Sequence, residues 1–145
     1  MQVNSKKFVL LSWAKDIQII KDIRTEVFIK EQNIPEELEW DKDDEGAQHF
    51  GILSNDILIA YARVLIKQKI HIGRMAVRKK YRRVGIGSFL LSNICNQVDD
   101  RNHSKKIMLS AQEQAIPFYE KNLFQIRGNK YLDAGIIHYD MELVR

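Results

Sequence analysis

The sequence RKKYRRVGIGSFLL, residues 78–91, carries five basic residues in its first six positions, followed by glycines at positions 85 and 87. The preceding residues 70–77 are apolar enough for a buried strand, and apolar residues at helical spacing follow the glycines. At such a strand-to-helix turn the first helical amides are unpaired, and the helix dipole favours a negative charge. The pattern Arg82-x-x-Gly85-x-Gly87 therefore predicts a turn that binds a phosphate-like anion.

Two better-known phosphate-binding patterns do not fit this turn. A P-loop needs Gly-x-x-x-x-Gly-Lys-Ser/Thr, and no lysine follows Gly87. A dinucleotide-binding turn needs a third glycine, and Phe89 and Leu90 occupy that region. Glycines that serve only a tight turn are the alternative interpretation, although Arg82 and the flanking strand and helix favour an anion site.

Apolar periodicity outlines the rest of the fold. Strands are expected at residues 8–13, 49–54, 57–66, 70–77, 107–111 and 136–144. Helices are expected at residues 16–30, within 115–124, and after the glycine turn along the apolar stripe Ile86, Phe89, Leu90, Ile94 and Val98. This order predicts one α/β domain, a mixed central sheet of about six to seven strands flanked by about four helices.

The C-terminal segment IIHYDMELV alternates as a half-buried strand does. One face of this strand is expected to carry the apolar residues Ile137, Tyr139, Met141 and Leu143. The other face, expected to meet solvent, carries His138, Asp140 and Glu142.

Composition limits the class of protein. The 145 residues suffice for a single domain, 1–145, with a proper core. The single cysteine, Cys95, excludes an intramolecular disulfide and fits a reducing compartment. No signal peptide is expected, and the longest nearly apolar run, residues 57–66, is too short to span a bilayer. A cytoplasmic protein is therefore expected.

The net charge of +4 is unevenly distributed. The segment EELEWDKDDE, residues 36–45, contains seven acids and one lysine, so the rest of the chain is strongly basic. Such a chain can offer a cationic surface to an anionic partner and an acidic surface to a cationic one, although solvated surface is the simpler interpretation. A calcium loop starting at Asp41 is rejected, because its twelfth position is Ile52 rather than glutamate.

The segment RMAVRKKYRRVGIGSFLL, residues 74–91, resembles the acyl-CoA-binding motif of the GNAT superfamily of N-acetyltransferases, Gln/Arg-x-x-Gly-x-Gly/Ala after a strand. The segment AIPFYEKNLF, residues 115–124, is similar to a later helix of that superfamily, with its Phe-Tyr-Glu-Lys-x-x-Phe pattern. VFIKEQNIPEELEWDKDD, residues 27–44, further resembles the bacterial ElaA-like branch. The resemblance covers essentially the whole chain.

The resemblance implies acetyl-CoA as a co-substrate and direct transfer of its acetyl group to an amine. The strand before the turn would splay from its neighbour and offer backbone groups to the pantetheine, and the turn amides would hold the pyrophosphate. Because backbone does this, Arg82 should matter less for affinity than its position in the motif suggests. The implied cofactor-binding residues are Met75, Ala76, Val77, Arg82, Arg83, Val84, Gly85, Ile86, Gly87, Ser88, Gln112, Phe118 and Tyr119. Lys79, Lys80 and Lys121 either serve the 3′-phosphate of the nucleotide or are solvated surface lysines.

Two side chains are implied as catalytic. Tyr119 matches a tyrosine that donates a proton to the departing thiolate, for which a phenol of pKa about 10 is suited. Its alternative role is packing the helix on the sheet, which Phe118 can also do. His71 lies four residues before Met75, on the same face of an alternating strand, and an imidazole suits a general base. The rival bases are Glu31, Glu39, Asp41 and His49.

In the superfamily the connection after the first helix covers the acceptor site. Carboxylates there would attract a cationic amine such as a lysine, a polyamine or an aminoglycoside, whether small molecule or protein. The residues expected at the acceptor are Glu31, Gln32, Glu39, Asp41 and Asp44.

Two other functions stay open on the sequence alone. A non-catalytic acyl-CoA-binding or sensing module would need the same turn without turnover. A nucleic-acid-binding domain would use the excess of lysine and arginine, but the acidic segment and the lack of aromatics between the cations argue against it. No nucleic acid, membrane or metal partner is expected, whereas the C-terminal strands could pair with a second chain in a homodimer.

Overall fold

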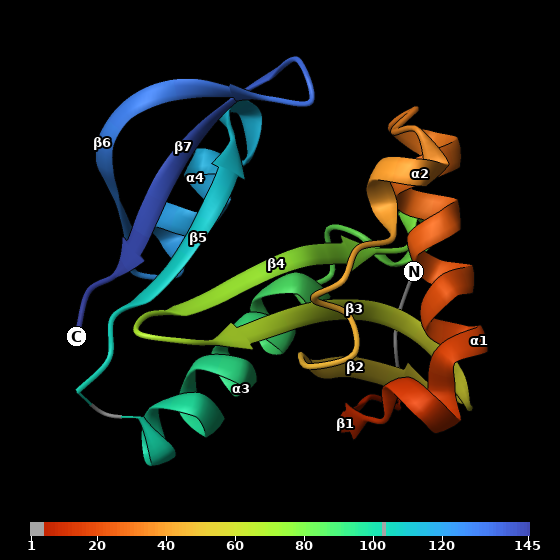
Figure 1. Cartoon of the computed structure of the whole chain (residues 1–145). Helices are drawn as coiled ribbons and strands as arrows, with labels where there is room; N and C mark the ends of the chain where they lie inside the picture. The colour runs from red at the N-terminus through yellow and green to blue at the C-terminus, as the bar shows by residue number, and fades with distance from the viewer. Residues whose placement is uncertain (1–4, 103) are drawn as a thin grey trace.

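A seven-stranded mixed sheet with the strand order β1-β2-β3-β4-β5-β7-β6 forms the centre of the computed structural model, which describes residues 5–102 and 104–145 (Figure 1). Its strands are β1 Lys7–Leu11, β2 Gln48–Ser54, β3 Ile57–Ile66, β4 Ile70–Val77, β5 Ile107–Gln112, β6 Phe124–Asp133 and β7 Ile136–Leu143. The α-helices are α1 Trp13–Arg24, α2 Glu36–Glu39, α3 Ile86–Arg101 and α4 Ile116–Lys121. A π-helical segment, η1 Thr25–Glu31, and two 3₁₀ turns, η2 Lys79–Tyr81 and η3 Glu113–Ala115, complete the elements. The predicted fold class is confirmed.

All neighbouring strands are antiparallel except β4 and β5, which are parallel. The β2–β3 hairpin turns at Asn55 and Asp56, whose φ angles of 50° and 65° are those of a tight primed turn. No helix among the described residues is long and apolar enough to cross a membrane. The parallel pair is the part of the sheet next to the predicted anion-binding turn, because the glycine turn follows the C-terminal end of β4 and leads into α3.

Two apolar clusters cover the two faces of the sheet. On one face, α3 contributes Ile86, Leu90 and Ile94 to a cluster against which α4 also packs. On the other face, α1 and η1 contribute Ile20, Ile23, Val27 and Phe28 to a second cluster. Figure 1 shows α1 and α2 on one side of β3 and β4, and α3 on the other. Helix α3, which follows the glycine turn, and the acidic segment around α2 therefore lie on opposite sides of the sheet.

The first helix differs from its prediction at both ends. It begins at Trp13 rather than Asp16, because Ser12 caps it: the Ser12 hydroxyl accepts from the Lys15 amide at 3.3 Å, and Asp16 accepts from the Ser12 amide at 2.8 Å. Its C-terminal part is π-helical from Thr25 to Glu31. π-Helical turns are rare in proteins, and those that occur are often found at functional sites. This segment carries Phe28 to the cavity described below.

Candidate active site

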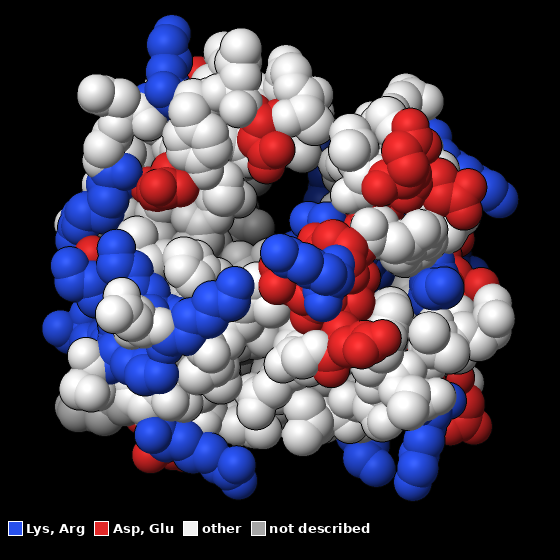
Figure 2. Space-filling model, in the orientation of Figure 1, with Lys and Arg blue, Asp and Glu red and all other residues white. Residues whose placement is uncertain are grey.

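Strands β4 and β5 pair only at their beginnings and then diverge. Their register covers Ile70–Ile72 of β4, so the backbone of Met75, Ala76 and Val77 has no partner on β5. A cavity of about 790 Å³ opens between the diverging strands, within the usual size of small-molecule sites. Figure 2 shows that the surface is hollowed between the C-terminal strands and the α2 region. Acidic side chains gather over the α2 region.

The turn after β4 borders this cavity through Arg82 and Arg83, which line it, and the glycines follow directly. Gly85 has a φ of 83° and precedes α3, and no side chain of the described residues caps the helix. The amide of Phe89 is the first to bond within the helix, donating to the Gly85 carbonyl at 3.0 Å. The preceding amides of the helix therefore remain for a ligand.

Gly87 lies in close contact with the helix that carries Tyr119. A Cβ at Gly87 would lie 3.1 Å from Cζ of Phe118, so no larger residue fits unless that ring moves. Asn122, at the end of the same helix, donates to Ser88 at 3.2 Å and to the Phe118 carbonyl at 2.8 Å. These contacts fix α4 against the start of α3.

Arg82 supports the turn through bonds within the protein. Its Nε donates to the Val77 carbonyl at 2.7 Å, and its two Nη atoms donate to the carboxylate of Glu31 at 2.6 and 2.7 Å. The hydrogen bond from Arg82 lowers the pKa of Glu31. The structure thus places Glu31, expected at the acceptor, in a pair with the arginine of the anion turn.

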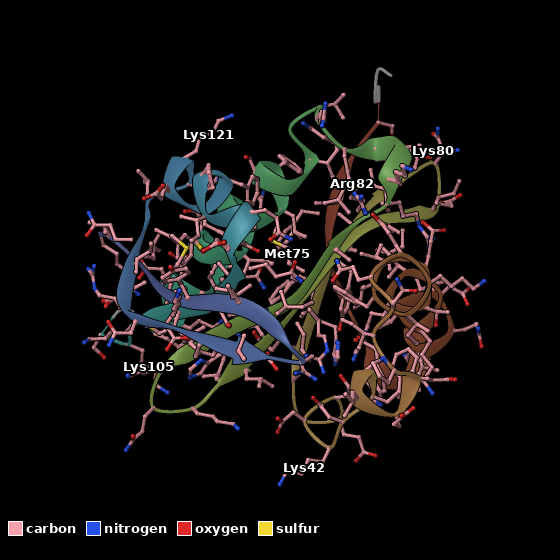
Figure 3. The ribbon with its side chains drawn as sticks, turned by 90° about the horizontal axis from the view of Figure 1, so that it is seen from above. Lys42, Met75, Lys80, Arg82, Lys105 and Lys121 are labelled. Atoms are coloured by element: carbon pink, nitrogen blue, oxygen red, sulfur yellow. The ribbon has the colours of Figure 1, made fainter. Side chains whose placement is uncertain are left out.

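Tyr119 faces the backbone that diverges from β5. Its half-buried hydroxyl lies 3.7 Å from the sulfur of Met75, and burial raises its pKa to about 12. A phenol with this pKa stays protonated at neutral pH and can donate a proton but not accept one. Met75 lies near the centre of Figure 3, whereas Lys80 and Lys121 lie at its margin, on either side of the turn.

Three glutamines connect the walls of the cavity. Nε2 of Gln112, the last residue of β5, donates to Oε1 of Gln32 at 3.2 Å, and Gln114 donates to Gln112 at 2.6 Å. All three side chains line the cavity. The sequence-derived cofactor residue Gln112 and acceptor residue Gln32 are therefore direct neighbours.

The acidic segment forms a largely buried ion-pair cluster with three arginines, of which Asp41 and Arg74 are the more exposed members. Arg24, fully buried, donates to Glu39 at 2.8 Å and to Asp44 at 2.7 Å. Arg63 donates to Asp41 at 2.6 Å and to Asp44 at 2.9 Å. Arg74 lies 3.2 Å from both Glu39 and Asp41, so the carboxylates Glu39, Asp41 and Asp44 are balanced by the guanidinium groups of Arg24, Arg63 and Arg74.

This cluster corrects the expectation that the three carboxylates attract the acceptor. Asp44 is 2% exposed and does not line the cavity, and neither does Asp41. Glu39 lines it but is 1% exposed and bonded to Arg24. Glu39 and Asp44 are buried and Asp41 is exposed, but all three are paired with arginines that join α1, β3 and β4 to α2 and the segment after it.

The predicted base His71 does not lie beside Met75. Tyr61 pairs with Ala76 and Arg63 with Gly73, so one residue of β3 faces the two residues Arg74 and Met75 of β4. This β-bulge, with Arg74 at a φ of 49°, reverses the alternation of the strand. Met75 consequently packs with the cluster of α3, whereas His71 is exposed on the opposite face, outside the cavity.

The rival base His49 is also unavailable. The ring is 1% exposed, with Nε2 2.8 Å from the Asp44 carbonyl and Nδ1 2.6 Å from the Tyr61 hydroxyl. Burial lowers the pKa of His49. Both ring nitrogens are engaged in the core, so this histidine cannot reach an acceptor.

Several cavity residues were not anticipated from the sequence. Among them are Phe28, Arg74, Ser110, Asp133, Ala134, Ile136 and His138. The sequence signal that could have indicated His138 is its position: it is an ionisable residue on the polar face of a regularly alternating strand. The expectation that this face meets solvent is wrong at His138, which is 9% exposed and lines the cavity, whereas Asp140 is exposed as expected.

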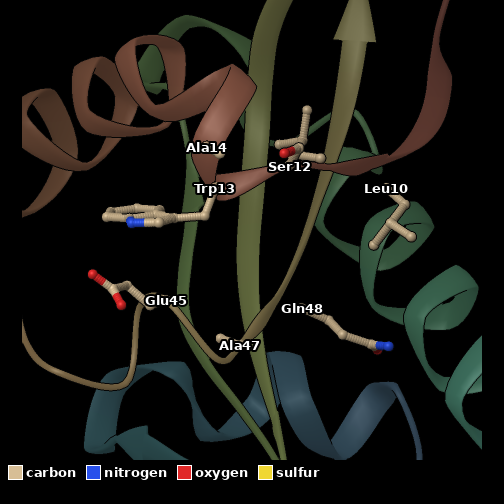
Figure 4. A pocket seen from close by; sticks show the side chains of 8 residues that line it. Leu10, Ser12, Trp13, Ala14, Glu45, Ala47 and Gln48 are labelled. Atoms are coloured by element: carbon tan, nitrogen blue, oxygen red, sulfur yellow. The ribbon is translucent and has the colours of Figure 1, made fainter.

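A second hollow lies at the other edge of the sheet, by the start of α1. Its volume is about 610 Å³, and it is lined by Leu10, Leu11, Ser12, Trp13, Ala14, Glu45, Ala47 and Gln48 (Figure 4). Among the described residues that line this hollow, Glu45 is the one ionisable side chain, and neither Tyr119 nor a residue of the glycine turn is present. The cavity between β4 and β5 is therefore the candidate active site.

The residues of this cavity fit an acyl-CoA. A phosphate would meet the uncapped amides before and at the start of α3, where Gly87 leaves room against Phe118. A thioester would meet the unpaired backbone at Met75, within reach of the Tyr119 hydroxyl. Both ends of the ligand thus find donors of the appropriate kind.

Comparisons with known proteins agree with this geometry. The model of the acetyltransferase (GNAT) domain matches residues 13–145. An uncharacterized N-acetyltransferase of Bacillus subtilis, YjcF, is 34% identical over 133 residues, which are 88% of this chain and 94% of that protein. The crystal structure of Escherichia coli ElaA superposes with a TM-score of 0.87 at 26% identity, covering 97% of this chain and 100% of that one. An acyl-CoA N-acyltransferase from Pseudomonas aeruginosa superposes with the same TM-score at 25% identity and the same coverage.

Proposed function

Because the chain belongs to the GNAT acetyltransferase family, we propose that this N-acetyltransferase acetylates the primary amine of a cationic acceptor bound between β4 and β5. Acetyl-CoA is the co-substrate of the family. The observation that supports the proposal most directly is the position of the Tyr119 hydroxyl. It lies 3.7 Å from the sulfur of Met75, where β4 and β5 diverge.

The proposed cofactor site uses mainly backbone. The amides from Arg83 to Ser88 hold the pyrophosphate, and the free backbone of Met75, Ala76 and Val77 holds the pantetheine. Arg82 holds the turn in place rather than the ligand, since Val77 and Glu31 already accept its hydrogen bonds. Gln112 and Phe118 border the site.

The acetyl transfer that we propose uses one protein group at the thioester carbonyl and another at the thioester sulfur. When bound, acetyl-CoA supplies a thioester carbonyl that an amine can attack. The Met75 amide donates to the carbonyl oxygen, and the Tyr119 hydroxyl donates its proton to the departing sulfur. Holding the amine beside these groups provides much of the reduction in the barrier by proximity.

The cationic character of the acceptor rests on a carboxylate that is not among those expected from the sequence. The cluster around Asp44 has no net charge, whereas Asp133 lines the cavity without an ion-pair partner among the described residues. Asp133 and Gln32 are therefore the acceptor-binding residues that we propose.

Thermal unfolding with acetyl-CoA, with ATP and NAD as controls, tests the cofactor site. At about 100 times its dissociation constant a ligand stabilises by about 2.7 kcal/mol, which raises the midpoint by on the order of 10 °C. A rise with acetyl-CoA alone is expected. No rise with millimolar acetyl-CoA would contradict the proposal.

Release of the CoA thiol in the presence of spermidine, free lysine and kanamycin tests the reaction. Turnover with at least one of these amines is expected. Binding of acetyl-CoA without turnover of any amine would instead favour the acyl-CoA-sensing alternative.

Two further properties belong to the same proposal. We place the reaction in the cytoplasm, in line with the single, buried Cys95. A homodimer would use β6, which is the edge strand of the sheet and exposed from Gln125 to Asp133. Sedimentation at two protein concentrations distinguishes a monomer from a dimer.

A further inference from the structure

His138 lies at the acceptor end of the cavity, on β7. Its register partners are Gln112 on β5 and Tyr131 on β6, and the ring stacks on Tyr131 with centroids 6.1 Å apart. We propose that Nε2 of His138 takes the proton from the acceptor's ammonium group and so makes the amine nucleophilic. This proposal rests on the proposed function, because it concerns the same reaction.

The hydrogen bond on the other ring nitrogen sets the tautomer. Nδ1 lies 2.8 Å from the carbonyl oxygen of Ile136, and a carbonyl can only accept, so Nδ1 carries the proton. Nε2 of the neutral ring then holds a lone pair. It makes no hydrogen bond with any residue of the described part of the chain and is not among its buried unsatisfied atoms, so this lone pair is open to the cavity.

Ionisable groups surround His138 on every element that lines this end of the cavity. Asp140, on β7, accepts from the Tyr131 hydroxyl at 2.7 Å, and that hydroxyl also bonds to Ser110 of β5. β6 contributes Asp133, and the far walls contribute Tyr119, Arg74 and the buried Glu39. Because Asp140 is engaged by Tyr131, Asp133 is the free carboxylate that can hold a cationic amine near Nε2.

The other described histidines lack this combination. His49 uses both ring nitrogens inside the core, and His71 lies on the far face of the bulged strand β4. In residues 5–102 and 104–145, His138 is therefore the imidazole with a free nitrogen in the cavity.

The proton balance of the step is complete. Of the three protons on the ammonium, one passes to Nε2 of His138 and then to solvent, and one remains on the amide product. The third leaves the nitrogen as the C–N bond forms and the C–S bond breaks. It restores the Tyr119 hydroxyl, whose own proton has gone to the sulfur.

His138→Asn is the informative variant, because its side-chain amide can still donate to the Ile136 carbonyl while Nε2 is lost. With the most active amine of the spermidine, lysine and kanamycin panel, kcat/KM at pH 7 should fall by about 10²-fold or more. The loss should shrink as the pH rises, since the amine then loses its proton to solvent. The rise in unfolding midpoint with acetyl-CoA should stay unchanged.

His71→Asn is the matched control and should leave kcat/KM unchanged at every pH. An equal loss at all pH values in His138→Asn would indicate a structural role and overturn the proposal. Loss in His71→Asn instead would overturn it as well.

A measurement on the protein without substrate tests the tautomer directly. Long-range ¹H–¹⁵N correlation spectra should show the neutral ring of His138, assigned by its absence from His138→Asn, with the proton on Nδ1. A proton mainly on Nε2 would overturn the proposal even if none of the three amines is acetylated. Absence of turnover combined with the Nδ1 tautomer would count against the proposed function alone.

Discussion

At the scale of single residues, Tyr119 combines two properties that a proton donor needs. Its hydroxyl lies beside the sulfur of Met75, and burial raises its pKa to about 12, so the phenol keeps its proton over the whole physiological range. Packing alone is provided by Phe118, whose ring meets Tyr119 edge-on at 5.1 Å. The hydroxyl of Tyr119 is thus the part of the side chain that packing does not require.

We therefore expect Tyr119→Phe to lower kcat by about 10²-fold while the acetyl-CoA-induced shift in unfolding midpoint is retained. Steady-state release of the CoA thiol measures kcat, and thermal unfolding measures binding. In the wild type, kcat should show no decline from this phenol up to about pH 10, the ordinary pKa of tyrosine.

Tyr81→Phe is the matched control for this prediction. Tyr81 is half-buried, and its hydroxyl makes no hydrogen bond with the described residues. Its variant should behave as the wild type does. An equal fall in kcat in both variants would show that the effect of Tyr119→Phe is not specific to its hydroxyl.

At the scale of elements, the turn between β4 and α3 depends on backbone conformation more than on side chains. Gly85 has a φ of 83°, which an L-residue adopts only at a cost of roughly 1–2 kcal/mol. Apart from its chain neighbours, no described residue has an atom within 4 Å of a Cβ built there, so the cost of a substitution is conformational rather than steric.

Gly85→Ala should destabilise the protein by about 1 kcal/mol and weaken acetyl-CoA binding by about tenfold, because the turn amides change direction. Urea unfolding measures the first effect, and calorimetric titration with acetyl-CoA measures the second. Gly46→Ala is the control, since Gly46 has no left-handed φ and no neighbour within 4 Å of a Cβ. Weakened binding in Gly46→Ala, or unchanged binding in Gly85→Ala, would contradict a backbone cradle.

The turn and the elements around it could be predicted because each has a local signal. The glycines, the alternation of residues 70–77 and the apolar stripe of α3 all act over a few positions. The bulge at Arg74 has no such signal, because its left-handed φ falls on an arginine rather than a glycine. The extra residue in β4 at the bulge places His71 and Met75 on opposite faces of the sheet. The period-two pattern from which His71 is predicted as the base does not reveal such a bulge.

At the scale of the whole molecule, the fold could be predicted from the sequence, but the partners of the charged residues could not. The acids of residues 36–45 read as a surface, yet Asp44 lies 2.7 Å from Arg24 of α1 and 2.9 Å from Arg63 of β3. Such contacts join residues about 20 positions apart and leave no mark on local composition. The same limit applies to His138, whose cavity is formed by elements far apart in the sequence.

The Asp44 cluster makes the stability of the molecule depend on pH. Burial opposes ionisation of Asp44, but the hydrogen bonds from Arg24 and Arg63 outweigh it and lower its pKa below the ordinary value. A carboxyl with a lowered folded-state pKa stabilises the protein above its unfolded-state pKa. This contribution is lost as the pH falls through the folded-state value.

Asp44→Asn should therefore lower the free energy of unfolding at pH 7 by about 3 kcal/mol or more, since it leaves two buried guanidinium groups short of a partner. Urea unfolding at several pH values should show this difference shrinking as the pH falls below about 3.9, the ordinary pKa of aspartate. Asp43→Asn is the control, because that carboxylate is half-exposed and lies 3.8 Å from the exposed Lys67, so its effect should stay within about 0.5 kcal/mol. A loss in Asp44→Asn that is no larger than in Asp43→Asn would mean that the cluster does not hold α1, β3 and β4 together.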